Sequence, residues 1–212
     1  MPTTEMMGRA MLVSDLCASL GDGGKKLGDL DWDRIIDTAA MDLGRFRRRI
    51  KAARLDLAAD VTDYPAPADL VRFRSHSWGD AERRSRHPWD DDYPRPSPRV
   101  TVLEGEGGRL LHITPAPSAA DIGRAGAVLH YHYCAGHSVG DQAAQTTVRP
   151  EDRGLLLLRA QAEAMLDRSL HQSGKPVQLR DGFSGAPRNG TPAALYGQLM
   201  KQVESQAARA AS

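Results

Sequence analysis

The chain has 212 residues, with 28 Lys and Arg against 27 Asp and Glu and a formal net charge of +1. This balance gives no overall basic field, so it does not favour a nucleic-acid-binding protein, although it excludes no local patch. Only 5% of the residues are aromatic, and 20 Gly and 13 Pro interrupt the chain, which predicts a modest core with long stretches of turn.

Two cysteines, Cys17 and Cys134, lie far apart in the sequence. They do not form a disulfide framework, which favours synthesis in a reducing compartment. No apolar run approaches the roughly 20 residues of a membrane span, and the N-terminus lacks the apolar run of a secretory signal. We expect a soluble protein made in a cytoplasm.

The first predicted elements are a short helix over 7–20 and an amphipathic helix over 32–48. In the second helix apolar residues recur at helical spacing, and Asp29 or Asp31 can cap its start. Arg45 and residues 47–49 place positive charge at its C-terminal end, where the helix dipole favours cations. The alternative interpretation of these arginines is a contact with nucleic acid or an acidic partner.

Strands are predicted over 54–57 and over 70–74, with a proline-rich extended segment before the second. Residues 76–99 are polar, charged and broken by prolines, so we interpret them as a long loop. Trp78 and Trp89 in this loop need a surface to bury them, and we expect another subunit to provide it. The acidic run that follows Trp89 is interpreted as a solvated turn rather than as a cation site.

A β-hairpin is predicted from two strands, 100–104 and 109–113, which a glycine-rich turn joins. A second extended proline segment, TPAPSA, follows the hairpin. A further strand is then predicted over 127–135, and a long helix over 150–172. Pro150 suits the first turn of that helix, and Gly174 closes it.

The C-terminal part reads as an extended linker over 175–190 and a last helix over 192–208. Because about sixteen loop residues separate this helix from the rest, we expect it to bind another protein rather than to complete the core. Its apolar side chains are the expected contacts: Leu195, Tyr196, Leu199, Met200 and Val203.

The stretch HYHYCAGH, residues 130–137, is the part of the chain most suggestive of chemistry. On a strand, His130, His132 and Cys134 share one face, and the two tyrosines share the other. Zinc binds these residue types, but neighbours on one face are about 6.5–7 Å apart and no second short-spaced motif accompanies them. The pattern favours a strand with one tyrosine face and one mixed face, at a sheet edge or a subunit contact.

Catalytic motifs are weak throughout. There is no GxSxG, and GDGGKK at 21–26 lacks the flanking strand and the Ser or Thr of a phosphate-binding loop. Cys134 lies near His137, but a reactive thiolate needs a base from elsewhere and a positive pocket. We therefore expect a protein that is not an enzyme and needs no cofactor or metal.

The order of phrases is more informative than any single site. A helix that opens with a tryptophan is followed by a strand, YPAPADL with WG shortly after, and a hairpin. TPAPSAADI then leads into HYHYCAGH and RPEDRGLLLLRAQAEAM. Over roughly residues 30–170 the chain resembles the head-to-tail adaptor proteins, also called connector or neck proteins, of tailed bacteriophages and gene transfer agents.

The resemblance implies a structural protein of the virion neck, assembled in the host cytoplasm. Adaptors form a ring, usually of twelve copies, below the portal protein, and their C-terminal segment reaches up to grip the portal. Stopper or tail proteins bind the lower face, and packaged DNA passes through the lumen without sequence-specific binding. No catalytic activity and no cofactor are implied.

The expected architecture is an α+β fold. A helical bundle formed by 32–48 and 150–172 carries an inserted antiparallel β module over 53–135, and 1–174 form the adaptor core. The C-terminal arm and helix occupy 175–212. Residues expected to bind partners are Leu195, Tyr196, Leu199, Met200, Val203, Trp78 and Trp89.

Three alternatives remain open. The chain is another neck component, such as a stopper or a tail-completion protein. Or it is a metal-dependent hydrolase that uses His130, His132 and either Cys134 or His137. Or it is a DNA-binding module that uses the arginines at 45 and 47–49.

Overall fold

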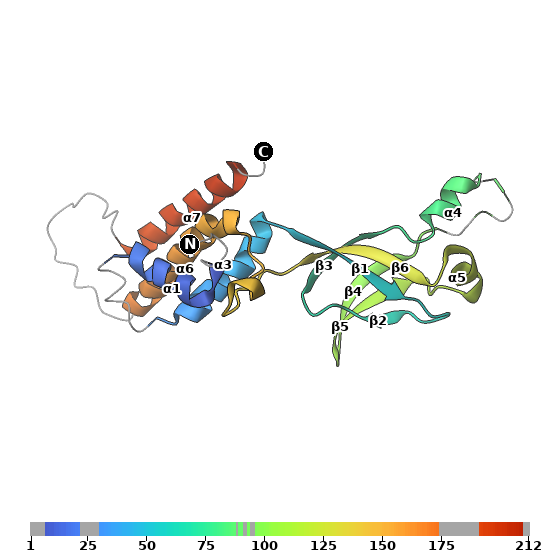
Figure 1. Ribbon diagram of the computed structural model, residues 1–212, viewed down its shortest axis with the longest axis horizontal. Coiled ribbons are helices and arrows are strands. Elements are labelled where there is room, and N and C mark those ends of the chain that lie inside the picture. The colour runs from blue at the N-terminus through green and yellow to red at the C-terminus, as the bar shows by residue number, and fades with distance from the viewer. Residues whose placement is uncertain are drawn as a thin grey trace. The chain divides into compact units, whose positions relative to one another are not determined.

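The computed structural model describes residues 7–21, 30–87, 89–90, 93, 96–173 and 191–209. The chain forms two compact units, which Figure 1 shows. The helical unit is built from both ends of the chain, Met1–Arg47 and His137–Ser212, and the β unit from Arg48–Gly136. The predicted α+β class is confirmed. In the described part of the chain, no helix has the length and apolar character needed to cross a membrane.

The helical unit contains helices α1 (Arg9–Ser19), α3 (Trp32–Phe46), α6 (Arg153–Ser173) and α7 (Pro192–Arg209), with short 3-10 turns at Ala143–Gln145 and Pro150–Asp152. The sequence predicts the first three closely, and the apolar spacing is most regular in α3. Asp31 caps α3, where its side chain accepts a hydrogen bond from the Arg34 backbone N–H at 3.0 Å. The other candidate cap, Asp29, lies outside the described residues.

The core of the helical unit lies around α6, which packs against both α3 and α7. A buried ion pair lies within it: the Arg159 guanidinium is 2.8 Å from Asp42 and 2.9 Å from the buried Glu163. Burial acts to lower the pKa of Arg159, but the hydrogen bonds to the two carboxylates raise it overall. The fully buried large side chains of this core are Met7, Leu12, Leu16, Ile35, Ile36, Leu43, Leu156 and Val203.

Helix α7 does not stand apart from the core, contrary to the prediction. It packs along α6, and Val203 and Ala207 are buried in the shared core. Leu195, Tyr196 and Leu199 are partly buried against the same core, and Met200 is half-buried. The physical reason is that an amphipathic helix must cover its apolar stripe, and a groove of the same chain is always nearby. The division between a core over 1–174 and an arm over 175–212 is therefore wrong for this helix.

The β unit contains two antiparallel sheets of three strands each. In sheet A, the strand β6 (Val128–Ala135) lies between β1 (Arg49–Asp56) and β3 (Leu70–His76). In sheet B, the strand β5 (Gly108–Thr114) lies between β2 (Asp63–Pro65) and β4 (Arg99–Gly105). The predicted hairpin is confirmed as β4 and β5. The expectation that the HYHYCAGH strand lies at a sheet edge is wrong, since β6 is central and pairs on both sides (Figure 1).

Two short helices were not predicted, one within the segment 76–99 that was interpreted as a loop and one between the TPAPSA segment and β6. These are α4 (Asp80–Ser85) and α5 (Ala119–Ala125). A capping box opens α5, where Ser118 and Asp121 exchange side-chain and backbone hydrogen bonds. Hydrogen bonds from Ser118 also hold the pKa of Asp121 below its usual range. The spacing of a serine three residues before an acidic residue is a known start signal, so α5 was readable from the sequence.

The inner faces of the two sheets share one core. Strand β3 contributes to it through two register shifts, one between Leu70 and Arg72 and one between Phe73 and Ser75. These bulges leave Leu70 buried and Phe73 and His76 partly buried, at a spacing of three instead of two. The buried members of this core are Leu57, Tyr64, Leu70, Trp78, Leu111, Ile113, Leu129, Tyr131, Tyr133 and Ala135.

Candidate functional site

The histidine strand has the two faces that its alternation predicts. Tyr131 and Tyr133 are buried, whereas His130 and His132 are exposed. The Tyr133 hydroxyl donates to Asp69 Oδ1 at 2.9 Å, which fixes the inward face of the strand. Among the residues that the structure describes, no group of three His, Cys, Asp or Glu side chains is arranged to hold a metal ion.

His137, the last histidine of the motif, belongs to the helical unit and is buried there. Its Nε2–H donates to the backbone carbonyl of Arg47, with 2.7 Å between the nitrogen and the oxygen. Nδ1 is also buried and has no hydrogen-bond partner among the described residues. The ring is thus used to tie the end of α3 to the chain segment that follows β6.

The outward side of sheet A forms a surface that we call the open face. Residues that pair across antiparallel strands project to the same side of a sheet, so the register of β1, β6 and β3 identifies most of its members. Val71 and Arg74 lie at the two bulges of β3 without a paired partner, and they are included because they are exposed. All are exposed except Cys134, which is half-buried. The open face consists of Ile50, Ala52, Arg54, Asp56, Val71, Arg72, Arg74, Ser75, Val128, His130, His132 and Cys134.

The cationic side chains of sheet A have different partners on its two sides. On the inner side, Lys51 Nζ lies 2.8 Å from Asp69 Oδ2, and Arg49 lies 3.5 Å from the same carboxylate. Burial alone would raise the pKa of Asp69, but hydrogen bonds from Lys51 and Tyr133 lower it overall. The same contacts raise the pKa of Lys51. Each inward cation therefore has an anionic partner.

On the open face, Arg54, Arg72 and Arg74 make no hydrogen bond and no ion pair with any residue that the structure describes. Arg54 lies opposite His130 on β1, and Arg72 lies opposite Cys134 on β3. Arg74 occupies the second bulge, next to Ser75, which is the partner of His132. The sequence alternation of β3 gives no sign of this arrangement, because the bulges change which residues face outward.

The arginine cluster at the end of α3 is not the free cationic patch that the DNA-binding alternative needs. Arg45 lies 3.0 Å from Asp42, and Arg47 lies 2.8 Å from Asp152. Arg49 contacts Asp69, as described above, and Arg47 also donates to the Ala207 carbonyl at 3.1 Å. Three of the four arginines are thus engaged within the chain, and Arg48 is exposed.

The two tryptophans of the segment 76–99 have opposite environments. Trp78 is only 8% exposed, and its indole N–H donates to the Gly126 carbonyl at 2.8 Å. The expectation that Trp78 needs another subunit to bury it is therefore wrong, because the core of the β unit already encloses it. Trp89 is 78% exposed and stacks on His87, with 4.8 Å between the ring centroids. Trp89 remains a candidate for partner binding.

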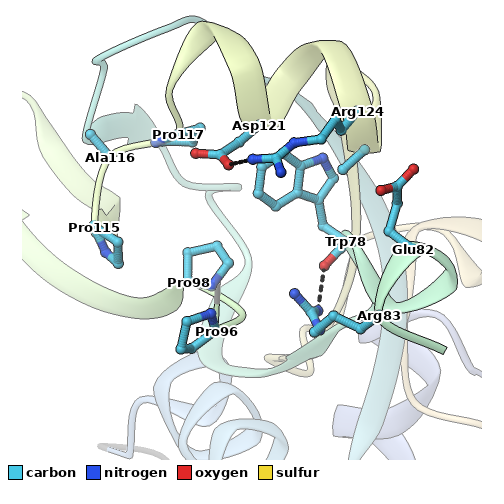
Figure 2. A pocket seen from close by; sticks show the side chains of 12 residues that line it. Trp78, Glu82, Arg83, Pro96, Pro98, Pro115, Ala116, Pro117, Asp121 and Arg124 are labelled. Carbon is cyan, nitrogen blue, oxygen red and sulfur yellow. Dashed lines mark hydrogen bonds and ion pairs between the residues drawn. The ribbon is translucent and has the colours of Figure 1, made fainter. Parts of the chain in front are cut away.

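A small hollow lies beside Trp78, and Figure 2 shows the side chains that line it. Asp121 and Arg124 pair across its rim at 2.7 Å, and Arg83 donates to the Trp78 carbonyl at 3.0 Å. Glu82 Oε2 is buried at the hollow without a hydrogen-bond partner among the described residues. Prolines supply much of the remaining wall: Pro96, Pro98, Pro115 and Pro117.

The size of the hollow decides what it can hold. Its free volume is about 40 Å³, room for about three water molecules and far below the roughly 300 Å³ of a small-molecule site. Water in the hollow would solvate the Glu82 carboxylate. A wider open groove of about 520 Å³ adjoins it and extends to Val128 and His130 at one end of the open face. The groove therefore continues the open face towards α4 and α5.

Neither a protein-family model nor a curated protein matches this chain. The functional assignment therefore depends on the residues themselves. The features that the described structure brings forward are the exposed Trp89, the open face of sheet A and the groove next to it.

Proposed function

We propose that the chain is a head-to-tail adaptor of a tailed bacteriophage or gene transfer agent. It is a structural subunit that forms a ring below the portal protein in the neck of the virion, and packaged DNA passes through that ring to the tail. The proposal draws first on the order of sequence phrases over roughly residues 30–170, which resembles that of adaptor proteins. The helical unit with an inserted antiparallel β unit is the architecture expected for it.

The observation that carries the proposal is the exposure of Trp89. Single exposed aliphatic residues are common on monomers, but an indole that is 78% exposed presents a large apolar surface to water. Tryptophan is the side chain most often found at the energetic centre of protein–protein contacts. In a cyclic ring every copy offers this residue to its neighbour, so one contact is repeated around the ring.

The docking of α7 changes one part of the proposal. Val203 is fully buried against α6, and Leu195 and Leu199 pack on the same core, so these side chains are not free to grip a portal. Removal of the helix would also expose the apolar surface of α6. The proposal therefore keeps the portal as a partner, but it does not assign the contact to the apolar stripe of α7.

The test is assembly with the portal protein encoded in the same genome. The purified chain and the portal are mixed, and the complex is examined by light scattering and negative-stain electron microscopy. We expect a closed ring of the chain on one end of the portal. The Trp89→Ala variant should need a higher protein concentration than the wild type to assemble. Met41→Ala, which removes an exposed side chain from α3, should assemble at the same concentration as the wild type.

Three outcomes are informative against the proposal. A chain that stays monomeric and does not co-sediment with the portal overturns it. A ring that forms but ignores the portal favours a stopper or tail-completion protein. Equal assembly of Trp89→Ala and the wild type removes the observation that carries the proposal.

A further inference from the structure

The open face gathers three arginines that have no carboxylate partner among the described residues. Elsewhere the described arginines are commonly engaged by carboxylates: Arg9 lies 2.7 Å from Asp37, and Arg34 lies 2.7 Å from Asp167. Arg153 pairs with Asp15 in the same way. The chain thus supplies acidic partners for cations at many positions.

The open face supplies no such partner. Its only carboxylate is Asp56, so three arginines and one aspartate leave a local charge of 3 − 1 = +2 with the histidines neutral. Neighbouring strands lie about 4.8 Å apart and each residue rises about 3.4 Å along a strand. Arg54 lies opposite His130 and Arg72 lies opposite Cys134, four residues further along β6, so the two arginines are about 17 Å apart. A concentration of unpaired cations on one uncovered surface attracts a polyanion.

The composition of the open face indicates which polyanion fits. Sheets that bind single-stranded nucleic acid stack the bases on exposed aromatic rings. Here the larger aromatic side chains of the three strands, Phe73, Tyr131 and Tyr133, lie on the inner side. The open face has no exposed phenyl, phenol or indole ring, and His130 and His132 are its only aromatic rings. Guanidinium groups on a surface without Phe, Tyr or Trp suit the phosphate backbone of a duplex, which needs no base contact.

We propose that the open face of sheet A binds the phosphate backbone of duplex DNA, through Arg54, Arg72 and Arg74. This inference rests on the proposed function, because it names the surface that faces the DNA passing through the ring. The contact is independent of sequence, and three phosphate contacts per subunit are weak enough for DNA to slide. In a ring, many copies contact the same duplex together.

The test measures the binding of a short fluorescent DNA duplex to the purified chain by anisotropy. The triple variant Arg54→Ala, Arg72→Ala, Arg74→Ala is compared with the wild type. If three phosphates are neutralised, wild-type affinity should fall about 40-fold between about 50 and 200 mM salt, and the triple variant should lose nearly all of this salt dependence. At the lower salt concentration the variant should bind at least about tenfold more weakly.

The matched control removes the same charge from other exposed positions. The variant Arg84→Ala, Arg99→Ala, Arg149→Ala takes three arginines from α4, β4 and the turn before α6. Its salt dependence should stay close to that of the wild type. A second variant with lysine at positions 54, 72 and 74 should keep most of the affinity, which shows that the alanine variant loses charge and not fold.

Several results overturn the inference. They are equal losses in the triple variant and the control, tighter binding of single-stranded than of duplex DNA, and no duplex binding by the wild type at low salt. If duplex binding is absent and the triple variant also fails to assemble with the portal, the open face docks a protein instead. If wild-type rings form on the portal but the triple variant binds DNA normally, the DNA contact is wrong while the adaptor proposal stands.

Discussion

The two units of this chain differ in how far their arginines are paired. In the helical unit, most of the described arginines lie beside carboxylates, and the most buried of them, Arg159, contacts two. In the β unit, the inward cations Arg49 and Lys51 are paired, but the three arginines of the open face have no partner among the residues that the structure describes. An internal ion pair fixes a protein's own structure, whereas an unpaired charge on an uncovered surface is available to another molecule. The difference indicates that the charges of the helical unit are mostly paired within it, and that the β unit is where charged contacts with partners are expected.

The largest expected effect comes from the buried pair in the helical unit. Arg159→Ala leaves Glu163 buried without its partner, which should lower the free energy of unfolding by about 4 kcal/mol. Amide hydrogen exchange along α6 measures the loss in that unit alone. Arg168→Ala on the same helix is the control and should change stability by less than about 0.5 kcal/mol. Equal losses in the two variants would mean that the buried pair has no special role.

The two tryptophans give the next contrast, this time within the β unit. Trp78→Ala removes a buried ring and the hydrogen bond to Gly126, so it should lower the free energy of unfolding by about 3 kcal/mol. Trp89→Ala should change it by less than about 0.5 kcal/mol. Chemical denaturation followed by exchange of the β-unit amides measures both. A large loss from Trp89→Ala would place that side chain in the folded core and remove it from partner binding.

The packing of α7 on α6 predicts a smaller loss of stability when a buried side chain of α7 is shortened. Val203→Ala deletes two methyl groups from a fully buried position, which should cost about 2 kcal/mol. The neighbouring Gln202 is exposed, and Gln202→Ala should have little effect. Exchange protection of α7 amides is the readout, because a helix that stood apart from α6 would be unprotected in the wild type as well as in the variant.

The smallest expected effect is the loss of stability at low pH that follows from protonation of Asp69. Asp69 has a lowered pKa in the folded state, so its stabilising contacts are complete above its unfolded pKa of about 3.9 and are lost as the pH falls through the folded value. The melting temperature should therefore drop below about pH 4, and Asp69→Asn should drop less because it has no carboxylate to protonate. At neutral pH the variant should lose about 1 kcal/mol or less, since the contacts are partly exposed. Parallel pH profiles for the two proteins would exclude this role of Asp69.

Local signals were enough to predict much of the fold. The helices α1, α3 and α6 follow from apolar spacing, the Asp31 cap follows from its residue type, and the β4–β5 hairpin follows from its glycine turn. These features depend on neighbours within a few residues, which a sequence displays directly. The capping box at Ser118 belongs to the same class of signal.

The features that the sequence did not predict depend on distant contacts. Whether Trp78 is buried by its own chain or by another depends on Gly126, 48 residues away. The docking of α7 on α6 depends on contacts between side chains that are far apart in the sequence. In β3, simple alternation would put Leu70 and Arg72 on one face, and the bulge between them places them on opposite faces. The sequence predicted the outward face of β6 but not the arginines of β3 beside it, and three of the four arginines at 45 and 47–49 are paired within the chain.

The hydrogen bond from His137 to Arg47 joins the residue where the chain leaves the helical unit to the residue where it returns. Because these two residues are in contact, the β unit between them begins and ends at one place on the helical unit. A short glycine–serine linker in place of residues 48–136 should therefore connect Arg47 to His137 without disturbing the helical unit, and a different β domain can be inserted at the same position.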